Sequence, residues 1–203
     1  ETASSDASDT TAEIQALADT GITAANDAIA VISAYNGTGT APTVQQYIDA
    51  GVTGVTVENL AAVNAQVETA SSDASDTTAE IQALADAGIT AASDAIADSD
   101  AVLGKIGTEA DTSTSSVTLD EINTIIPPIT GVIDGNLAAY QTYAANPGNF
   151  ESPATSTEVQ TMVTAVNAAE VTSAGVLAQI GTEANTAAPS VVTVAQINTI
   201  SPA

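Results

Sequence analysis

The fold is decided by residues 68–97, which read ETASSDASDTTAEIQALADAGITAASDAIA and occur almost unchanged at residues 1–30. The two copies differ at only two positions, Thr20 against Ala87 and Asn26 against Ser93. Repetition of this kind is typical of architectures in which one supersecondary unit is built again along the chain. It favours a structural or multivalent role over a single active site.

Each copy contains the start of a helix. Thr77 and Glu80 match the capping box Thr-x-x-Glu, in which the Thr oxygen accepts from the third amide and the acid reaches back to the cap. Apolar residues then recur three and four positions apart, as one face of an α-helix requires. The same start is found at Thr10/Glu13, Thr118/Glu121 and Thr155/Glu158, and with glutamine at Thr43/Gln46 and Thr193/Gln196.

Three long stripes of helically spaced apolar residues begin at Ile14, Ile81 and Val159, and glycines mark their ends or lie within them. The stripes stop at Gly37, Gly107 and Gly181, and we expect each of these residues to lie just past a helix end. Gly21 and Gly88 lie inside the first two stripes, where glycine costs about 1 kcal/mol relative to alanine. We expect these two to bend or divide their helices.

A weaker repeat places short helices between the long ones. The capped patterns at Thr43, Thr118 and Thr193 are 75 residues apart, and Thr-Gly-Val followed by Asn-Leu-Ala-Ala recurs at 53–62 and 130–139. The predicted fold is all-α, with tandem three-helix-bundle repeats in an elongated array. The predicted organisation is a third helix of a preceding unit with a linker (1–41), a complete three-helix unit (42–107), a linker (108–116), a diverged three-helix unit (117–181), and a linker with the first helix of a following unit (182–203).

The end helices are then expected to leave apolar surface that neighbouring sequence or another copy of the chain covers. An arbitrary fragment with frayed ends is the alternative interpretation. The expected partners are therefore neighbouring repeats, or copies of the chain itself, joined end to end.

Composition excludes several classes of function. Lys105 is the only cation against 25 acids, which gives a formal charge of -24, and the chain has no His, Cys or Trp. Phosphate neutralisation needs basic residues, so we expect no nucleic-acid binding and no attraction to anionic membrane surfaces. No apolar run is long enough for a transmembrane segment, so no membrane insertion is expected. No signal peptide is visible, and the acidic balance suits a salty exterior.

Two stretches carry a resemblance. PTVQQYIDAGVTGVTVENLAAVNAQV (42–67) and DTTAEIQALADAGIT (76–90) resemble the Ala/Thr/Asp-rich tandem helical modules of giant surface proteins of Gram-negative, often marine, bacteria. Those proteins are adhesin-like or biofilm-associated, and the modules are thought to act as extenders. The resemblance implies an extracellular, structural role at the bacterial cell surface, and it carries over no functional residues.

Clustered carboxylates are the candidate metal ligands. Asp73 and Asp76, their copies Asp6 and Asp9, and the pair Asp98 and Asp100 are weak candidates for Ca²⁺, which prefers several oxygen ligands. The clusters lack the EF-hand spacing and the Gly-Asp nonapeptide pattern. Asp76 fits N-terminal capping and helix-dipole chemistry better. We therefore predict no cofactor, with calcium as the alternative.

The aromatic residues are few, namely Tyr35, Tyr47, Tyr140, Tyr143 and Phe150. They could form a glycan-stacking face, but as the largest side chains of an Ala-rich chain they are expected to be packing anchors. Catalysis has little support because His and Cys are absent and Lys105 stands alone. Paired carboxylates could hydrolyse glycosides, but that chemistry usually needs an aromatic-lined cleft. We therefore predict a protein that is not an enzyme.

Three functions follow in order of preference. The first is a spacer or stalk segment of a bacterial surface adhesin or biofilm matrix protein. The second is a protomer that assembles into an extracellular filament or surface lattice through its end helices. The third is a cation- or glycan-binding module, whose surface ligand the sequence does not identify.

Overall fold

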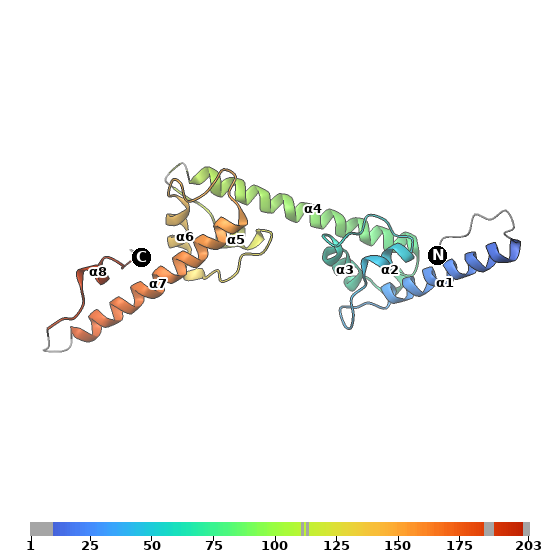
Figure 1. The fold of residues 1–203 in the computed structure, drawn as a ribbon, viewed down its shortest axis with the longest axis horizontal. Coiled ribbons are helices and arrows are strands. Elements are labelled where there is room, and N and C mark those ends of the chain that lie inside the picture. The colour runs from blue at the N-terminus through green and yellow to red at the C-terminus, as the bar shows by residue number, and fades with distance from the viewer. Residues whose placement is uncertain (1–9, 111, 113, 185–188, 201–203) are drawn as a thin grey trace. The chain divides into compact units, whose positions relative to one another are not determined.

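The computed structural model describes residues 10–110, 112, 114–184 and 189–200. No β-strand occurs among these residues, and the all-α prediction is confirmed. Figure 1 shows long helices alternating with short ones. The long helices are α1 (Thr11–Ser33), α4 (Thr78–Glu109) and α7 (Ser156–Glu183). The short ones are α2 (Val44–Asp49), α3 (Leu60–Thr69), α5 (Leu119–Thr124), α6 (Leu137–Ala144) and α8 (Val194–Ile197), with 3-10 turns η1 (Ser72–Ala74) and η2 (Asp134–Asn136).

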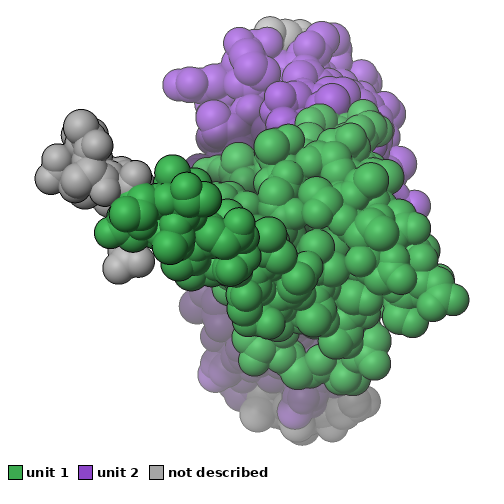
Figure 2. Space-filling model, turned by 90° about the vertical axis from the view of Figure 1, so that its right-hand side faces the viewer, with its two compact units in different colours: residues 1–94 green, residues 95–203 purple. Residues whose placement is uncertain are grey.

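The chain divides into two compact units, residues 1–94 and residues 95–203, which Figure 2 colours separately. The boundary falls within α4. The core of the first unit is built by the second half of α1, by α2 and α3, and by the first half of α4. Its buried residues are Ala28, Ile32, Tyr47, Ala50, Val52, Val55, Val63, Val67, Ile81 and Ala85.

The second unit repeats this plan with the next helices along the chain. Its core takes the second half of α4, then α5 and α6, then the first half of α7. The buried residues are Val102, Ile106, Ala110, Val117, Ile122, Ile125, Tyr140, Ala144, Phe150, Ala154, Val159, Met162, Val163 and Val166. Each core therefore draws on four helical segments, and the two halves of α4 belong to different cores.

The predicted helix starts are confirmed. Capping boxes are complete at the first residues of α1, α2, α5, α7 and α8. At α4, the Glu80 amide donates to Thr77 Oγ1 at 3.3 Å, and the Thr77 amide donates to Glu80 Oε2 at 3.1 Å. Two of the four amides that a helix leaves without an intrahelical partner are satisfied at each of these ends.

The expectation that glycines end the long helices is wrong for Gly107 and Gly181. Both lie inside their helices, which continue to Glu109 and Glu183. At Gly107 the reason is close packing, because a Cβ there would lie 2.6 Å from the carbonyl oxygen of Glu151. Gly37 does lie in the turn that follows α1, with φ of +81°.

Gly21 and Gly88 do not divide their helices, so the division expected there is wrong. Both α1 and α4 run through these positions. Gly88 allows close approach of α3, because a Cβ there would lie 2.5 Å from the Cα of Val63. At Gly21, no atom would lie within 4 Å of such a Cβ.

Candidate functional site

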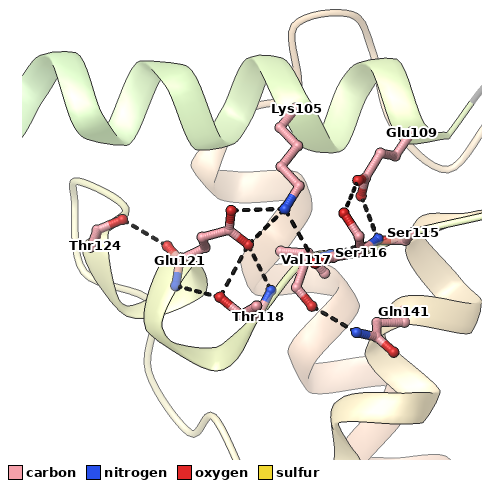
Figure 3. A network of polar contacts seen from close by, with 9 residues as sticks. All are labelled: Lys105, Glu109, Ser115, Ser116, Val117, Thr118, Glu121, Thr124 and Gln141. Atoms are coloured by element: carbon pink, nitrogen blue, oxygen red, sulfur yellow. Dashed lines mark hydrogen bonds and ion pairs between the residues drawn. The ribbon is translucent and has the colours of Figure 1, made fainter.

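A network of polar contacts surrounds Lys105, on the second half of α4 (Figure 3). Its Nζ donates to Glu121 Oε1 at 2.8 Å, to Glu121 Oε2 at 2.9 Å and to the carbonyl oxygen of Ser116 at 3.2 Å. Lysine has three donors, so these contacts engage the whole ammonium group. The only cation in the chain is therefore committed to an internal contact.

Glu121 is held in place by the start of α5. Its Oε2 accepts from the Thr118 amide at 2.8 Å and from Thr118 Oγ1 at 3.1 Å, as the acid of a capping box does. Partial burial would raise its pKa, but the hydrogen bonds from Lys105 and Thr118 together hold the pKa of Glu121 below its ordinary value. The carboxylate therefore stays ionised where the short helix meets α4.

A second carboxylate closes the loop between these helices. Glu109, the last residue of α4, accepts from Ser115 Oγ at 2.7 Å, from Ser116 Oγ at 2.6 Å and from the Ser116 amide at 3.0 Å. Burial opposes ionisation here, but the serine hydrogen bonds prevail and lower the pKa of Glu109. From α6, Gln141 Nε2 donates to the carbonyl oxygen of Val117 at 2.9 Å. The cluster thus joins α4, α5, α6 and the intervening loop.

The contact between the end of a long helix, the following loop and the next short helix is here called the corner. The same corner is built again between α7 and α8. Residues 102–110 read VLGKIGTEA and residues 176–184 read VLAQIGTEA, so Lys105 corresponds to Gln179. Glu121 corresponds to Gln196, whose Nε2 donates to Gln179 Oε1 at 3.1 Å. The ion pair of one corner becomes an amide pair in the next, and both partners change together. Sequence reasoning missed this pairing, which aligning the two stretches would have revealed.

The contacts of this corner hold α4 and α5 together, and they do not form a reactive site. The Lys105 and Glu121 side chains are 30% and 31% exposed, and each is occupied by the other. We therefore assign the cluster a structural role.

Two tyrosines donate hydrogen bonds to asparagine side chains within the cores. Tyr47 is fully buried, and its hydroxyl donates to Asn64 Oδ1 at 2.7 Å, while Asn64 Nδ2 donates to the carbonyl oxygen of Pro42 at 3.0 Å. Burial, followed by the nearby Tyr35, raises the pKa of the Tyr47 phenol far above its ordinary value. The second unit also has a tyrosine–asparagine pair, but on other elements: Tyr140 Oη of α6 donates to Asn167 Oδ1 of α7 at 2.6 Å.

The packing interpretation of the aromatics is confirmed for the three buried rings, Tyr47, Tyr140 and Phe150. Tyr143 is partly buried and meets Phe150 edge to face, with ring centroids 6.1 Å apart. Tyr35 is partly buried against the first core. The sequence did not indicate the asparagines, because their role depends on a buried phenol that needs a partner.

The structure separates the calcium candidates. Asp73 lies in η1, and Asp76 precedes the cap of α4, where its hydrogen bond with Glu80 raises the Asp76 pKa. Asp98 and Asp100 are two residues apart on α4, so their side chains do not face each other. Asp6 and Asp9 lie outside the described residues. No group of three or more His, Cys, Asp or Glu side chains in the described part of the chain is placed to hold a metal, and calcium binding stays a prediction.

One of the surface grooves lies beside α7 in the second unit. Its walls carry no acid, base or thiol, being formed by Pro127, Pro128, Ile129, Ser156, Thr157, Gln160, Thr161, Thr164, Ala165 and Ala168. Such a lining offers neither a general acid nor a general base for catalysis. None of the helices in the described ranges is long and apolar enough to cross a bilayer.

Comparison with known proteins gives no further assignment: no family model, curated protein or solved structure matches this chain.

Proposed function

We propose that this chain is a structural repeat segment, acting as a spacer or stalk in a bacterial surface adhesin or biofilm matrix protein. One observation carries the proposal: the same corner, a long helix leading through a loop into a Thr-capped short helix, is built three times, at α1–α2, α4–α5 and α7–α8. Recurrence of one packing unit along a chain is typical of repeat proteins.

The proposed arrangement is a tandem array with three helices in each sequence repeat. The first such set is α2, α3 and α4, and the second is α5, α6 and α7. The long helix α4 gives its first half to the core of the first unit and its second half to the core of the second unit. Repeats of this kind depend on their neighbours for burial, which supports an array over independent domains.

An extracellular location is part of the proposal. A formal charge of -24 makes the chain strongly self-repelling. Dissolved salt reduces that repulsion, because it screens charges that lie farther apart than a Debye length. The single cation is engaged inside the second unit, so it gives no basic patch for binding anionic partners. The resemblance of residues 42–67 and 76–90 to modules of giant surface proteins also supports this role.

A filament-forming protomer is the second candidate. The observation that favours it is the exposed apolar face on the first half of α1, where Ile14, Leu17 and Ile22 meet no core. End-to-end association through such faces would strengthen with salt, since screening weakens the repulsion between acidic chains. A cation- or glycan-binding module is third.

Two measurements test these functions. Sedimentation of the purified chain at low and at seawater-like salt should give a monomer at both if it is a spacer. Salt-dependent polymers would favour the filament. Immunogold electron microscopy of the source cells should label thin surface threads, and label confined to the cell interior would overturn the surface role.

A further inference from the structure

Two copies of one sequence lie in different surroundings within the first unit. The first half of α4 buries Ile81 and Ala85 completely, and Gly88 is also buried. The first half of α1, which differs from it only in having Thr20 where α4 has Ala87, exposes the matching face, with Ile14 at 62%, Leu17 at 44% and Ile22 at 59%. The difference cannot come from the helix sequence, so it comes from what covers the helix.

In α4 the cover is the helix pair α2–α3 with its connecting turn. Gly88 meets the backbone of Val63 on α3. Thr78 Oγ1 donates to the carbonyl oxygen of Ala50 at 2.9 Å. Gln82 brackets the turn, since its Oε1 accepts from the Thr53 amide at 2.9 Å and its Nε2 donates to the Thr53 carbonyl oxygen at 3.2 Å.

The bracket between a long helix and a turn recurs in the second unit. Gln160 of α7 accepts from the Thr130 amide at 2.8 Å and donates to the Thr130 carbonyl oxygen at 3.1 Å. The turn again belongs to a pair of short helices, α5 and α6. The glutamine that is the fifth residue of the long helix therefore binds the Thr-Gly-Val turn in both units, and serves as a recurring receptor for it.

The first half of α1 carries every part of this receptor. Thr11 matches Thr78, Gln15 matches Gln82, and Gly21 matches Gly88. Gln15 Nε2 donates to Asp19 Oδ1 at 2.7 Å, a contact that Gln82 also makes with Asp86 while it brackets its turn. Gly21 weakens the helix, and within the structure no atom lies close enough to require it.

We infer that the first half of α1 is the docking face for a helix pair of the α2–α3 type, belonging to another repeat. The occupant has a Thr-Gly-Val turn that Gln15 brackets, and a following helix whose backbone passes over Gly21. Residues 42–67 of this chain are the known example, since they occupy the identical face of α4. The inference rests on the proposed repeat array and names the contact by which its members join.

The test is an extended chain in which residues 42–67 are placed directly before Glu1, so that the sequence preceding residue 68 also precedes residue 1. Amide hydrogen exchange across Ile14–Ile22 should slow by about tenfold or more, toward the rates across Ile81–Ile89. Peptides that contain Thr20 or Ala87 differ in mass, so the two copies can be followed separately.

A matched glycine substitution completes the test. Gly21→Ala should leave exchange in α1 unchanged or slower in the natural chain, because a Cβ there is unobstructed. In the extended chain the same substitution should remove the gained protection. An extended chain that protects Ile81–Ile89 but not Ile14–Ile22 would overturn the docking face. That result would leave the surface role to be decided separately by the immunogold labelling.

Discussion

The first halves of α1 and α4 have the same sequence from the cap to Asp19 and Asp86, yet only the α4 copy is buried. Both form helices with the same capping box, so the local sequence is sufficient for the helix. The α4 copy is buried because the helix pair α2–α3 and its connecting turn cover it. Helix formation and helix packing are thus separable in this protein.

The largest expected contrast is between Ile81→Ala and Ile14→Ala. Ile81 is fully buried, so its truncation should lower the stability of the first unit by about 3 kcal/mol. Ile14 is 62% exposed, and its truncation should stay within about 0.5 kcal/mol. Denaturant unfolding of the two variants measures the difference. Equal losses would show that α1 is covered in solution.

Tyr47→Phe tests the core on which the α4 copy packs. Removing the hydroxyl leaves Asn64 Oδ1 buried without its donor, which should cost about 1–2 kcal/mol. Tyr35→Phe is the control, since that ring is only partly buried, and it should have little effect. Thermal unfolding of both variants provides the measurement. A neutral Tyr47→Phe would mean that the amide finds another partner.

The caps should make the two copies behave alike. Thr10→Ala and Thr77→Ala each remove the oxygen that accepts from the third amide, at 3.3 Å in both helices. Each should destabilise its first helical turn by about 1 kcal/mol. Amide exchange of Glu13 and Glu80, read by NMR, compares them directly. A much larger loss at Thr77 would show that packing depends on the cap.

The smallest effect concerns charge at the Lys105 corner. Glu121→Gln keeps the capping box, as Gln46 and Gln196 do in their helices, but removes the ion pair. The loss should be about 0.2–1 kcal/mol near neutral pH.

Its pH dependence has a definite sign. The folded-state pKa of Glu121 lies below its ordinary value of 4.5, so the stabilisation is complete above that value. It is lost as the pH falls through the lowered pKa, and wild type and variant should then converge. A difference that persists in acid would mean that the charge is not the cause. Unfolding both chains along a pH series gives the comparison.

The sequence predicted what is local. Threonine with an acid or amide three positions later identified the starts of α1, α2, α4, α5, α7 and α8, because a capping box is complete within four residues. The starts of α3 and α6, at Asn59 and Asn136, have no side-chain cap and were not identified in this way. The tyrosines were predicted as core residues because large rings in an Ala-rich chain have few other uses. The all-α fold followed from these caps and from the helical spacing of apolar residues.

What depends on distant partners was not predictable. Gly107 was expected to end a helix, but it accommodates the backbone at Glu151, more than forty positions away in the chain. Asn64 and Asn167 were not singled out, because an asparagine gains its role only from the phenol that folding brings to it. The Lys105–Glu121 pair likewise spans two helices, and a lone lysine gives no sign of its partner.

The commitment of Lys105 has a consequence for proteolysis. Proteases that cut after lysine or arginine have one target in this chain, and it lies in the helical backbone of α4 with its ammonium group held by Glu121. Cleavage requires a locally unfolded, accessible backbone, so the native chain should outlast trypsin-like enzymes and be cut once when α4 opens. The placement of a single residue therefore limits how a major class of protease can attack the folded chain.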